Sequence, residues 1–508
     1  GTSRAAWTLA GALAGTFAVH LVAGYLSNLL FAVGFLGACA AVSAGHRRAT
    51  AAAVALLAAG GLAHPQFLAP GAAILLLVAA WEVTTSRDGG EFARIAWTVG
   101  GASAVVALGL VSMLIGSAQL TVDTSRDGFL RRAGLGDLVR GAYADRFVHR
   151  WTRYVQWVSL PLAAVGSLRE SDTGGRILRA WLLVIVTGIP VGLLTGLFPA
   201  DRLITFGYAV PILAAFGTVR LFHALADTRV GRRLAAAACA LVVVAMAAGS
   251  FIAWARQAPF VTQEETAQLR VLNRYVAGVP ADAAIVVRVD PGDRTVTFDV
   301  TRAANLIRAS VPTDRIADVH VVVSTEQAVG PPDEERRLLS EITAREARTA
   351  IADAGGRVLL ARLGAFFPFR LAEEIGSVEG VTVAPGVLIG ALGFQPRPTP
   401  EPIDPLQASS PSAIVGASVA VLALLWIVGY GWARTTMDAT AAAALAPAFG
   451  AAALTLVAVL SERAGLPLDG WVGPTVVSLL AAGGGYLCRI RLGAQREAAV
   501  DPPPQVEE

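Results

Sequence analysis

The chain has 508 residues, of which 55% are hydrophobic and only 16% are charged. A soluble domain usually carries about 25% charged residues, so this composition excludes an ordinary soluble enzyme and favours a membrane protein. The formal net charge of +3 is too small to indicate a nucleic-acid partner. Because the three cysteines and six histidines show neither a disulfide framework nor zinc-ligand spacing, the sequence supports no metal site and no other cofactor.

Twelve apolar stretches are long enough, or nearly so, to cross a bilayer core of roughly 30 Å as helices. By residue number they are 5–22, 25–45, 49–63, 67–83, 94–118, 152–168, 178–198, 201–221, 233–254, 412–433, 439–461 and 471–488. The sequence therefore predicts a polytopic α-helical membrane protein with about 12 spans. Nine spans fall within 1–254 and three within 412–490, and a disordered cytoplasmic tail is expected at 491–508.

Arginines alternate along the connections between these stretches. If Arg4 is cytoplasmic, every connection assigned to the inside contains at least one arginine, and the short outside connections contain few. The inside connections are 46–48, 86–94, 169–179, 220–233, 434–438 and the tail from 489. Because all 41 basic residues are arginine and alanine is abundant, the composition is typical of a GC-rich bacterial genome. We therefore expect a multi-pass protein of a bacterial plasma membrane, with a cytoplasmic C-terminus.

A segment of mixed composition, 255–411, interrupts the apolar series. Three predicted amphipathic helices alternate in it with three β-branched runs that predict strands. The helices cover 264–276, 303–309 and 333–354, and the strands cover 284–289, 319–324 and 357–363. This alternation is typical of a small parallel sheet covered by helices, so we expect an inserted extracytoplasmic α/β domain that ends in a Pro-rich linker. No glycine-rich phosphate loop follows any of these strands, so nucleotide binding has no support.

The outer loop 119–151 is long for a connection between two helices. Apolar residues recur in it at three- and four-residue steps, and Arg131 and Arg132 belong to a group of arginines beside that stripe. An amphipathic helix of this kind lies in the plane of the lipid headgroups, where arginine binds phosphate through two parallel hydrogen bonds. The loop therefore indicates a lipid-phosphate site or, alternatively, a plain anchor at the membrane surface.

Two short polar motifs lie at the outer ends of spans. Asp201 is a good helix N-cap, and Arg202 follows it at a helix start that attracts anions. These two residues favour a clamp for the phosphate of a lipid-linked donor, and a helix cap with a snorkelling arginine is the alternative. His64 and Gln66 flank the helix-breaking Pro65. They can contact donor or acceptor hydroxyl groups, or serve a structural role alone.

Glycosyl transfer to a hydroxyl group needs a carboxylate that acts as a general base. Asp123 and Asp127 in the outer loop are candidates for donor or acceptor contact, together with Asp137 and Asp145. Their spacing selects none of them, and solvated loop charges are the alternative. Ionisable residues are almost absent from the spans, which argues against an ion-coupled pump or channel.

In their order along the chain these features resemble the GT-C class of integral-membrane glycosyltransferases, most closely actinobacterial-type members. The matching segments are Gly24–Asn28, His64–Phe67, the basic outer loop, and 198–202 leading into 208–213. The resemblance covers about residues 1–255. It implies a multispan enzyme that takes a sugar from a polyprenyl-phosphate carrier and transfers it to a cell-envelope acceptor at the outer face.

One departure from that class concerns the catalytic base. In the class the catalytic aspartate lies in the first outer loop, whereas this chain has no acidic residue before Glu82. The resemblance then implies that the base lies upstream of Gly1 or has been lost, so only Arg202 is carried over, as a phosphate contact. Two other functions stay open: a transporter or flippase of a lipid-linked precursor, and a noncatalytic scaffold whose outer domain recruits an envelope protein or glycan.

Overall fold

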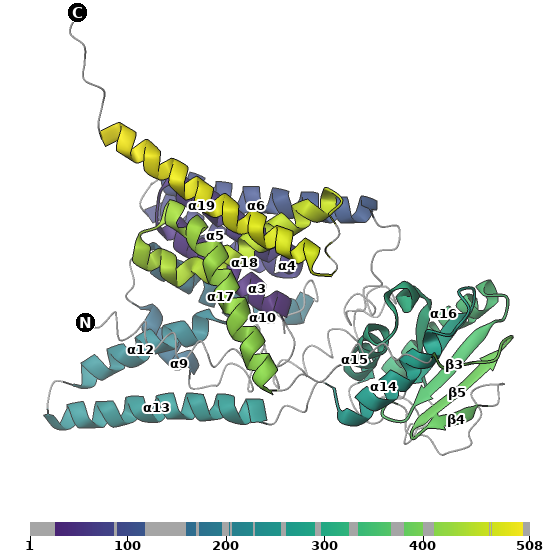
Figure 1. Cartoon of the computed structure of the whole chain (residues 1–508). Helices are drawn as coiled ribbons and strands as arrows, with labels where there is room; N and C mark the ends of the chain where they lie inside the picture. The colour runs from purple at the N-terminus through teal and green to yellow at the C-terminus, as the bar shows by residue number, and fades with distance from the viewer. Residues whose placement is uncertain are drawn as a thin grey trace, which may run out of the picture. The chain divides into compact units, whose positions relative to one another are not determined.

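We analysed a computed structural model of the chain (Figure 1). The structure describes residues 26–85, 89–116, 159–168, 172–195, 203, 206–226, 229–255, 261–289, 296–324, 334–366, 380–399, 411–466, 468 and 470–500. By their contacts these residues form two compact units. The helical unit contains the described residues up to 255 and from 411 onward, and the α/β unit contains those within 261–399.

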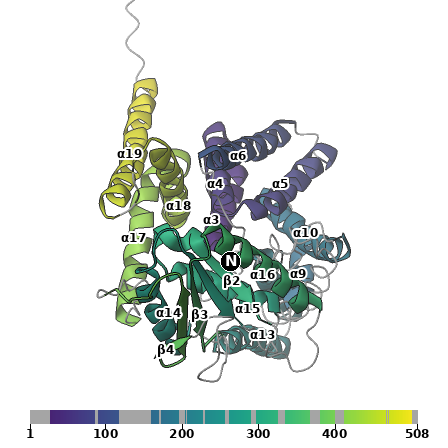
Figure 2. The ribbon, with the colours of Figure 1, turned by 90° about the vertical axis from the view of Figure 1, so that its right-hand side faces the viewer.

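The helical unit is built from long helices. In chain order they are α3 (Leu26–Ser43), α4 (Arg47–Ala63), α5 (Pro65–Thr85), α6 (Gly89–Gly116), α9 (Ser159–Ser167), α10 (Thr173–Thr195), α12 (Ala209–Leu225), α13 (Arg229–Ala255), α17 (Pro411–Thr436), α18 (Ala439–Arg463) and α19 (Val472–Val500). Helices α17, α18 and α19 pack against one another as a group (Figure 2). Helix α18 also contacts α3 and α4, which joins this group to the N-terminal helices.

Five of the described helices are long and apolar enough to cross a membrane, namely α5, α6, α10, α17 and α18. The chain is therefore a mainly helical protein with the composition of a membrane protein, but the expectation of about 12 spans is wrong for the described residues. Apolar runs at 49–63 and 201–221 correspond to α4 and α12, which have 17 residues each. Such a helix rises about 26 Å, less than the roughly 30 Å of the bilayer core.

Two other expected spans are shortened or diluted. The run 152–168 contributes the nine-residue helix α9 to the described residues, and α19 mixes its apolar residues with a triple glycine at 483–485 and with arginines. The first expected span, 5–22, lies outside the described residues. Apolar runs in the sequence do not show where a helix begins and ends, so they predict more spans than the described helices provide.

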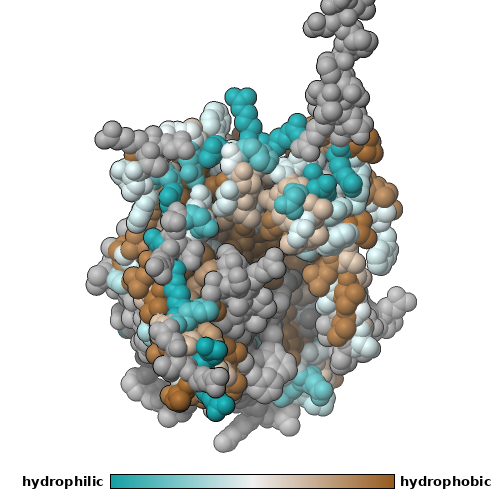
Figure 3. Space-filling view, turned by 90° about the vertical axis from the view of Figure 1, so that its left-hand side faces the viewer, coloured by the Kyte–Doolittle hydropathy of each residue, from teal (hydrophilic) through white to brown (hydrophobic). Residues whose placement is uncertain are grey.

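Large hydrophobic side chains are exposed on these helices. Trp97 and Leu108 on α6 are 73% and 71% exposed, and Leu241 on α13 is 70% exposed. Figure 3 shows hydrophobic residues spread over one face of the molecule, beside separate groups of hydrophilic ones. In water such surfaces mark interaction sites or membrane contact. On helices whose backbone is fully hydrogen-bonded, they suit contact with lipid.

Glycines set the closest helix contacts. A Cβ atom added to Gly166 on α9 would overlap the carbonyl oxygen of Leu213 on α12, and Gly217 on α12 meets α9 in the same way. Gly429 on α17 and Gly450 on α18 form a second pair of this kind. Small residues that let two backbones touch are the usual interface of membrane helices, because dispersion contacts replace the hydrophobic effect there.

The α/β unit consists of α14 (Gln263–Val276), β1 (Ala284–Val289), α15 (Val296–Ala309), the 3-10 turn η1 (Thr313–Asp318), β2 (Val319–Val323), α16 (Glu334–Asp353), β3 (Val358–Leu363), β4 (Val381–Ala384) and β5 (Val387–Leu392). Helix α14 begins with a capping box. The Thr262 hydroxyl accepts a hydrogen bond from the Glu265 N–H, and the Glu265 side chain accepts one from the Thr262 N–H. All three expected helices and all three expected strands form.

The sheet has the order β2-β1-β3-β5-β4 (Figure 1). Strands β1, β2 and β3 are parallel, whereas β5 pairs antiparallel with β3 and β4 antiparallel with β5. The expectation of a purely parallel sheet is therefore wrong. The last two strands form a hairpin, in which Ala384 pairs with Val387 across a two-residue loop that contains Gly386, whose φ is +70°. Its second strand, β5, joins the sheet antiparallel to β3.

Alternate residues of β1 and β3 pack in two cores on opposite faces of the sheet. Ile285, Val287 and Leu359 pack with residues of α14 and α15 on one face. Ala284, Val286 and Val358 pack with α16 on the other. The period of two along each strand explains this division, and it assigns Arg288 and Arg362 to the α16 face.

Candidate functional site

An aromatic cluster holds four segments of the helical unit together. It consists of Phe31 and Phe35 on α3, Phe67 on α5, Trp181 on α10 and Phe206 ahead of α12. The ring centroids of Phe31 lie 5.6 Å from Phe67 and 5.3 Å from Phe206, and those of Phe67 and Phe206 lie 5.4 Å apart. The Trp181 indole donates a hydrogen bond of 2.8 Å to the Phe206 carbonyl oxygen. All five side chains are buried.

This cluster joins the sequence segments that suggested a site. Helix α3 begins within the first segment, Phe67 belongs to the second, and Phe206 lies between the two parts of the third. Segments that are more than a hundred residues apart thus meet within the helical unit. Aromatic rings in offset or edge-to-face contact contribute about 0.5–1.5 kcal/mol per pair beyond their burial, so the meeting point is well fixed.

His64 and Gln66 lie at the edge of this cluster. His64 is the C-cap of α4, where its N–H donates a hydrogen bond of 2.9 Å to the Gly60 carbonyl oxygen. Its ring stacks on Phe67 at a centroid distance of 4.1 Å. Gln66 is exposed in the first turn of α5. The ring contact positions His64 through Phe67, so both polar residues border the meeting point of the three segments.

Asn28 is a site residue that sequence reasoning included in a motif but gave no role. It lies in the first turn of α3 and is 2% exposed. Neither its Oδ1 nor its Nδ2 has a hydrogen-bond partner among the described residues. Because residues three apart share a helix face, Asn28 lies on the same side of α3 as Phe31. A buried amide of this kind costs about 1–3 kcal/mol and offers one acceptor and two donors to a polar ligand.

The remaining predicted site residues lie outside the described residues: Arg131, Arg132, Asp123, Asp127, Asp201 and Arg202. Leu203, which follows Arg202 in the chain, is described and is 4% exposed. Together with Phe206 it ties the third segment to the buried cluster. The structure thus places the residues that follow Arg202 beside the segment of His64.

A buried ion pair at the other end of α5 escaped the sequence analysis. Glu82 is 1% exposed and pairs with Arg176 on α10. Nearby, the Thr173 hydroxyl donates a hydrogen bond of 3.0 Å to Glu91 on α6. The sequence did contain a signal for this pair. Glu82 is an acidic residue in an apolar run, and the connection 169–179, assigned to the same side, contains arginines. Because these groups satisfy one another between α5, α6 and α10, we assign them to helix packing.

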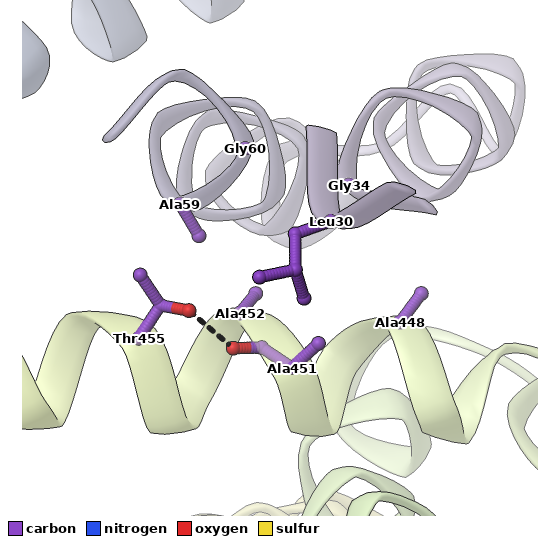
Figure 4. Close-up of a pocket in the computed structure, with 8 residues that line it drawn as sticks. All are labelled: Leu30, Gly34, Ala59, Gly60, Ala448, Ala451, Ala452 and Thr455. Atoms are coloured by element: carbon purple, nitrogen blue, oxygen red, sulfur yellow. Dashed lines mark hydrogen bonds between the residues drawn. The ribbon is translucent and has the colours of Figure 1, made fainter. Parts of the chain in front are cut away.

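Figure 4 shows a pocket between α3, α4 and α18. Its lining consists of Leu30, Gly34, Ala59, Gly60, Ala448, Ala451, Ala452 and Thr455. Thr455 has the only polar side chain of this set, and its hydroxyl already donates a hydrogen bond of 2.8 Å to the Ala451 carbonyl oxygen. The pocket therefore offers apolar contact and no group for chemistry.

Within the described part of the chain, no three His, Cys, Asp or Glu residues come together as a metal site. Comparisons with protein-family models, with curated proteins and with solved structures found no match. The case for a function therefore depends on the residues and contacts of this chain.

Proposed function

We propose that the chain is a membrane glycosyltransferase that takes a sugar from a polyprenyl-phosphate carrier at the outer face of a bacterial plasma membrane. The acceptor is a cell-envelope glycan, lipid or exported protein, which the α/β unit helps to recruit. Arg202, Arg131 and Arg132 bind the phosphate in this proposal. Transfer proceeds by direct displacement of the phosphate from the sugar, with a carboxylate that takes the proton of the acceptor hydroxyl.

The observation that carries the proposal is the convergence of three segments on the aromatic cluster. In the proposed enzyme the sugar needs polar contacts beside an apolar path for the polyprenyl chain. Asn28, His64 and Gln66 supply amide and imidazole groups for hydroxyl groups. The buried Phe31, Phe67 and Phe206 supply an apolar wall, on which His64 stacks through Phe67.

Contacts between helix ends support the proposed topology. His46 Nε2 donates to the Thr436 carbonyl oxygen at 2.9 Å, which joins two connections assigned to the inside. The bond from Thr173 to Glu91 joins another two. In these two cases, connections assigned to the inside contact each other, which supports their placement on one side of the membrane whatever the number of spans.

Reporter fusions test this topology. We expect a fusion after Arg48 or Arg233 to report the cytoplasm, because both residues lie in arginine-containing connections that are retained inside. A fusion within the α/β unit, for example after Gly355, is expected to report the outside. The measurement is paired alkaline phosphatase and fluorescent-protein activity in whole cells. A cytoplasmic signal from the α/β unit contradicts both the topology and the envelope function.

Replacement of Asn28 by leucine tests the site itself. Because leucine has a similar size and removes a buried amide, we expect the melting temperature of the purified protein to stay the same or rise. Binding of a polyprenyl-phosphate hexose in lipid nanodiscs is expected to weaken by about tenfold, since one hydrogen bond to the sugar is lost. The matched control is Ser43→Ala near the opposite end of α3, whose hydroxyl bonds to its own helix. Equal donor binding in both variants argues against a site at Asn28.

A further inference from the structure

Three arginines of the α/β unit, Arg288, Arg336 and Arg362, have no role in the proposed glycosyl transfer. Arg288 and Arg362 are Cα partners on the parallel strands β1 and β3. Neighbouring strands lie about 4.8 Å apart, and paired residues point to the same face. Arg362 is 2% exposed and Arg288 is half-buried. The two arginines thus leave neighbouring strands on the same face of the sheet, where little water reaches Arg362.

A third arginine comes from α16, which covers this face of the sheet. The Val323 N–H at the end of β2 donates a hydrogen bond of 3.0 Å to the Thr343 hydroxyl, which fixes α16 on that strand. Arg336 lies two helical turns earlier on the same side of α16 and is 5% exposed. Because α16 runs back from the end of β2 to the start of β3, its first turns lie at the carboxyl edge of the sheet. Arg336 therefore lies beyond that edge, about 10 Å along the helix from Thr343, on the same face of the sheet as Arg288 and Arg362.

Arg288 and Arg362 lie where sheets with this strand order usually bind ligands. The chain places β2 on one side of β1 and β3 on the other, and it covers the two faces with α15 and α16. Sheets of this kind bind ligands outside the carboxyl ends of the strands at the point where the strand order reverses, which here lies between β1 and β3. Arg288 and Arg362 are the penultimate residues of those two strands.

We propose that Arg288, Arg336 and Arg362 bind a phosphate group at the carboxyl ends of β1 and β3. Like charges beside one another on a sheet are destabilising, and an anion between them offsets that repulsion. Each of the three arginines also has a partner within the chain. A guanidinium group has five donors in a planar fork, so it can hold such a partner and still donate to a phosphate oxygen.

The phosphate group is a monoester that belongs either to a soluble phosphate ester or to a lipid headgroup such as phosphatidic acid, which present the same terminal oxygens to arginine. The proposal is independent of the glycosyl-transfer proposal, because it concerns other residues in the other unit. Failure of one leaves the other intact.

The test measures inorganic phosphate binding to the full chain in detergent by isothermal titration calorimetry. Because each variant loses charge-assisted hydrogen bonds, we expect Arg288→Gln and Arg362→Gln to weaken binding about tenfold to a hundredfold. The matched control is Arg357→Gln. Arg357 precedes the opposite end of β3, where it pairs with Asp282 at the surface, and its replacement is expected to leave phosphate binding unchanged.

A second variant keeps the test decisive if the Arg362 variant fails to fold. Arg288→Lys retains the charge at a half-buried position but loses the planar fork, so we expect a folded protein with weaker phosphate binding. Nanodiscs with phosphatidic acid, compared with phosphatidylcholine alone, identify a lipid headgroup as the source. The proposal is overturned if neither phosphate nor phosphatidic acid binds the wild-type chain, or if Arg288→Gln and Arg288→Lys bind as tightly as Arg357→Gln.

Discussion

Replacement of Gly450 by leucine is expected to separate α18 from α17 and to destabilise the helical unit by at least about 3 kcal/mol. Overpacking of a well-packed core costs typically about 1–3 kcal/mol. Here even a Cβ atom would overlap the carbonyl oxygen of Leu425, and Gly429 faces the same crossing from α17. Backbone atoms cannot rotate away as a side chain can, so the two helices must move apart. The measurement is the thermal midpoint of the purified protein in detergent, together with its yield as a monodisperse peak.

Gly416 provides the matched control for this substitution. It lies on α17 as well, but a Cβ atom added there meets nothing within 4 Å. Gly416→Leu is therefore expected to leave the midpoint and the yield nearly unchanged, because lipid or detergent accommodates the side chain. If both leucine variants melt at the wild-type temperature, α17 and α18 do not cross at these glycines.

Arg202→Lys is expected to keep the positive charge and yet to lose donor binding by about tenfold to a hundredfold. A hydrogen bond to a charged group contributes about 1.5–3 kcal/mol, and each 1.4 kcal/mol is about a factor of ten in affinity. Lysine cannot reproduce the two parallel bonds that arginine makes to a phosphate. Arg202→Ala is expected to lose at least as much. The measurement is binding of a polyprenyl-phosphate hexose to the full chain in nanodiscs.

The control for Arg202 is Arg48→Lys, at an exposed position in a connection assigned to the inside. It changes the same chemical group on the opposite side of the membrane, so donor binding should match the wild type. Wild-type affinity in Arg202→Lys would mean that this arginine only anchors its helix among the headgroups. The phosphate clamp would then be wrong.

The α/β unit was predictable from the sequence where local pattern decides the structure. Strand β1 has the predicted bounds, 284–289, because a β-branched run between a turn and the charged sequence after Val289 leaves little choice of where the strand begins and ends. Strands β4 and β5 were missed, although Pro385-Gly386 is a turn signal. Their apolar runs are short, and the pairing of β5 with β3 is a long-range contact that no local pattern specifies.

The helical unit was harder to predict, for a physical reason. In a chain rich in alanine and glycine, apolar runs continue past helix ends, so the start of α12 at Ala209, inside the predicted run 201–221, carries little signal. The candidate site was predictable only as separate motifs. Nothing in the local sequence of His64 or Phe206 specifies that they belong to one cluster, since their meeting depends on the packing of α3 and α5 with the residues ahead of α12.

The central claim is that the chain moves a sugar from a polyprenyl-phosphate carrier to an envelope acceptor. Proteoliposomes that contain the full chain, a polyprenyl phosphate with one radiolabelled hexose and an extract of bacterial cell envelope test this claim directly. We predict that label appears in the envelope fraction, that the freed polyprenyl phosphate accumulates, and that Arg202→Ala lowers both. Label that crosses the bilayer but stays on its carrier would contradict the claim and identify a transporter instead, and label that neither moves nor transfers would favour a scaffold.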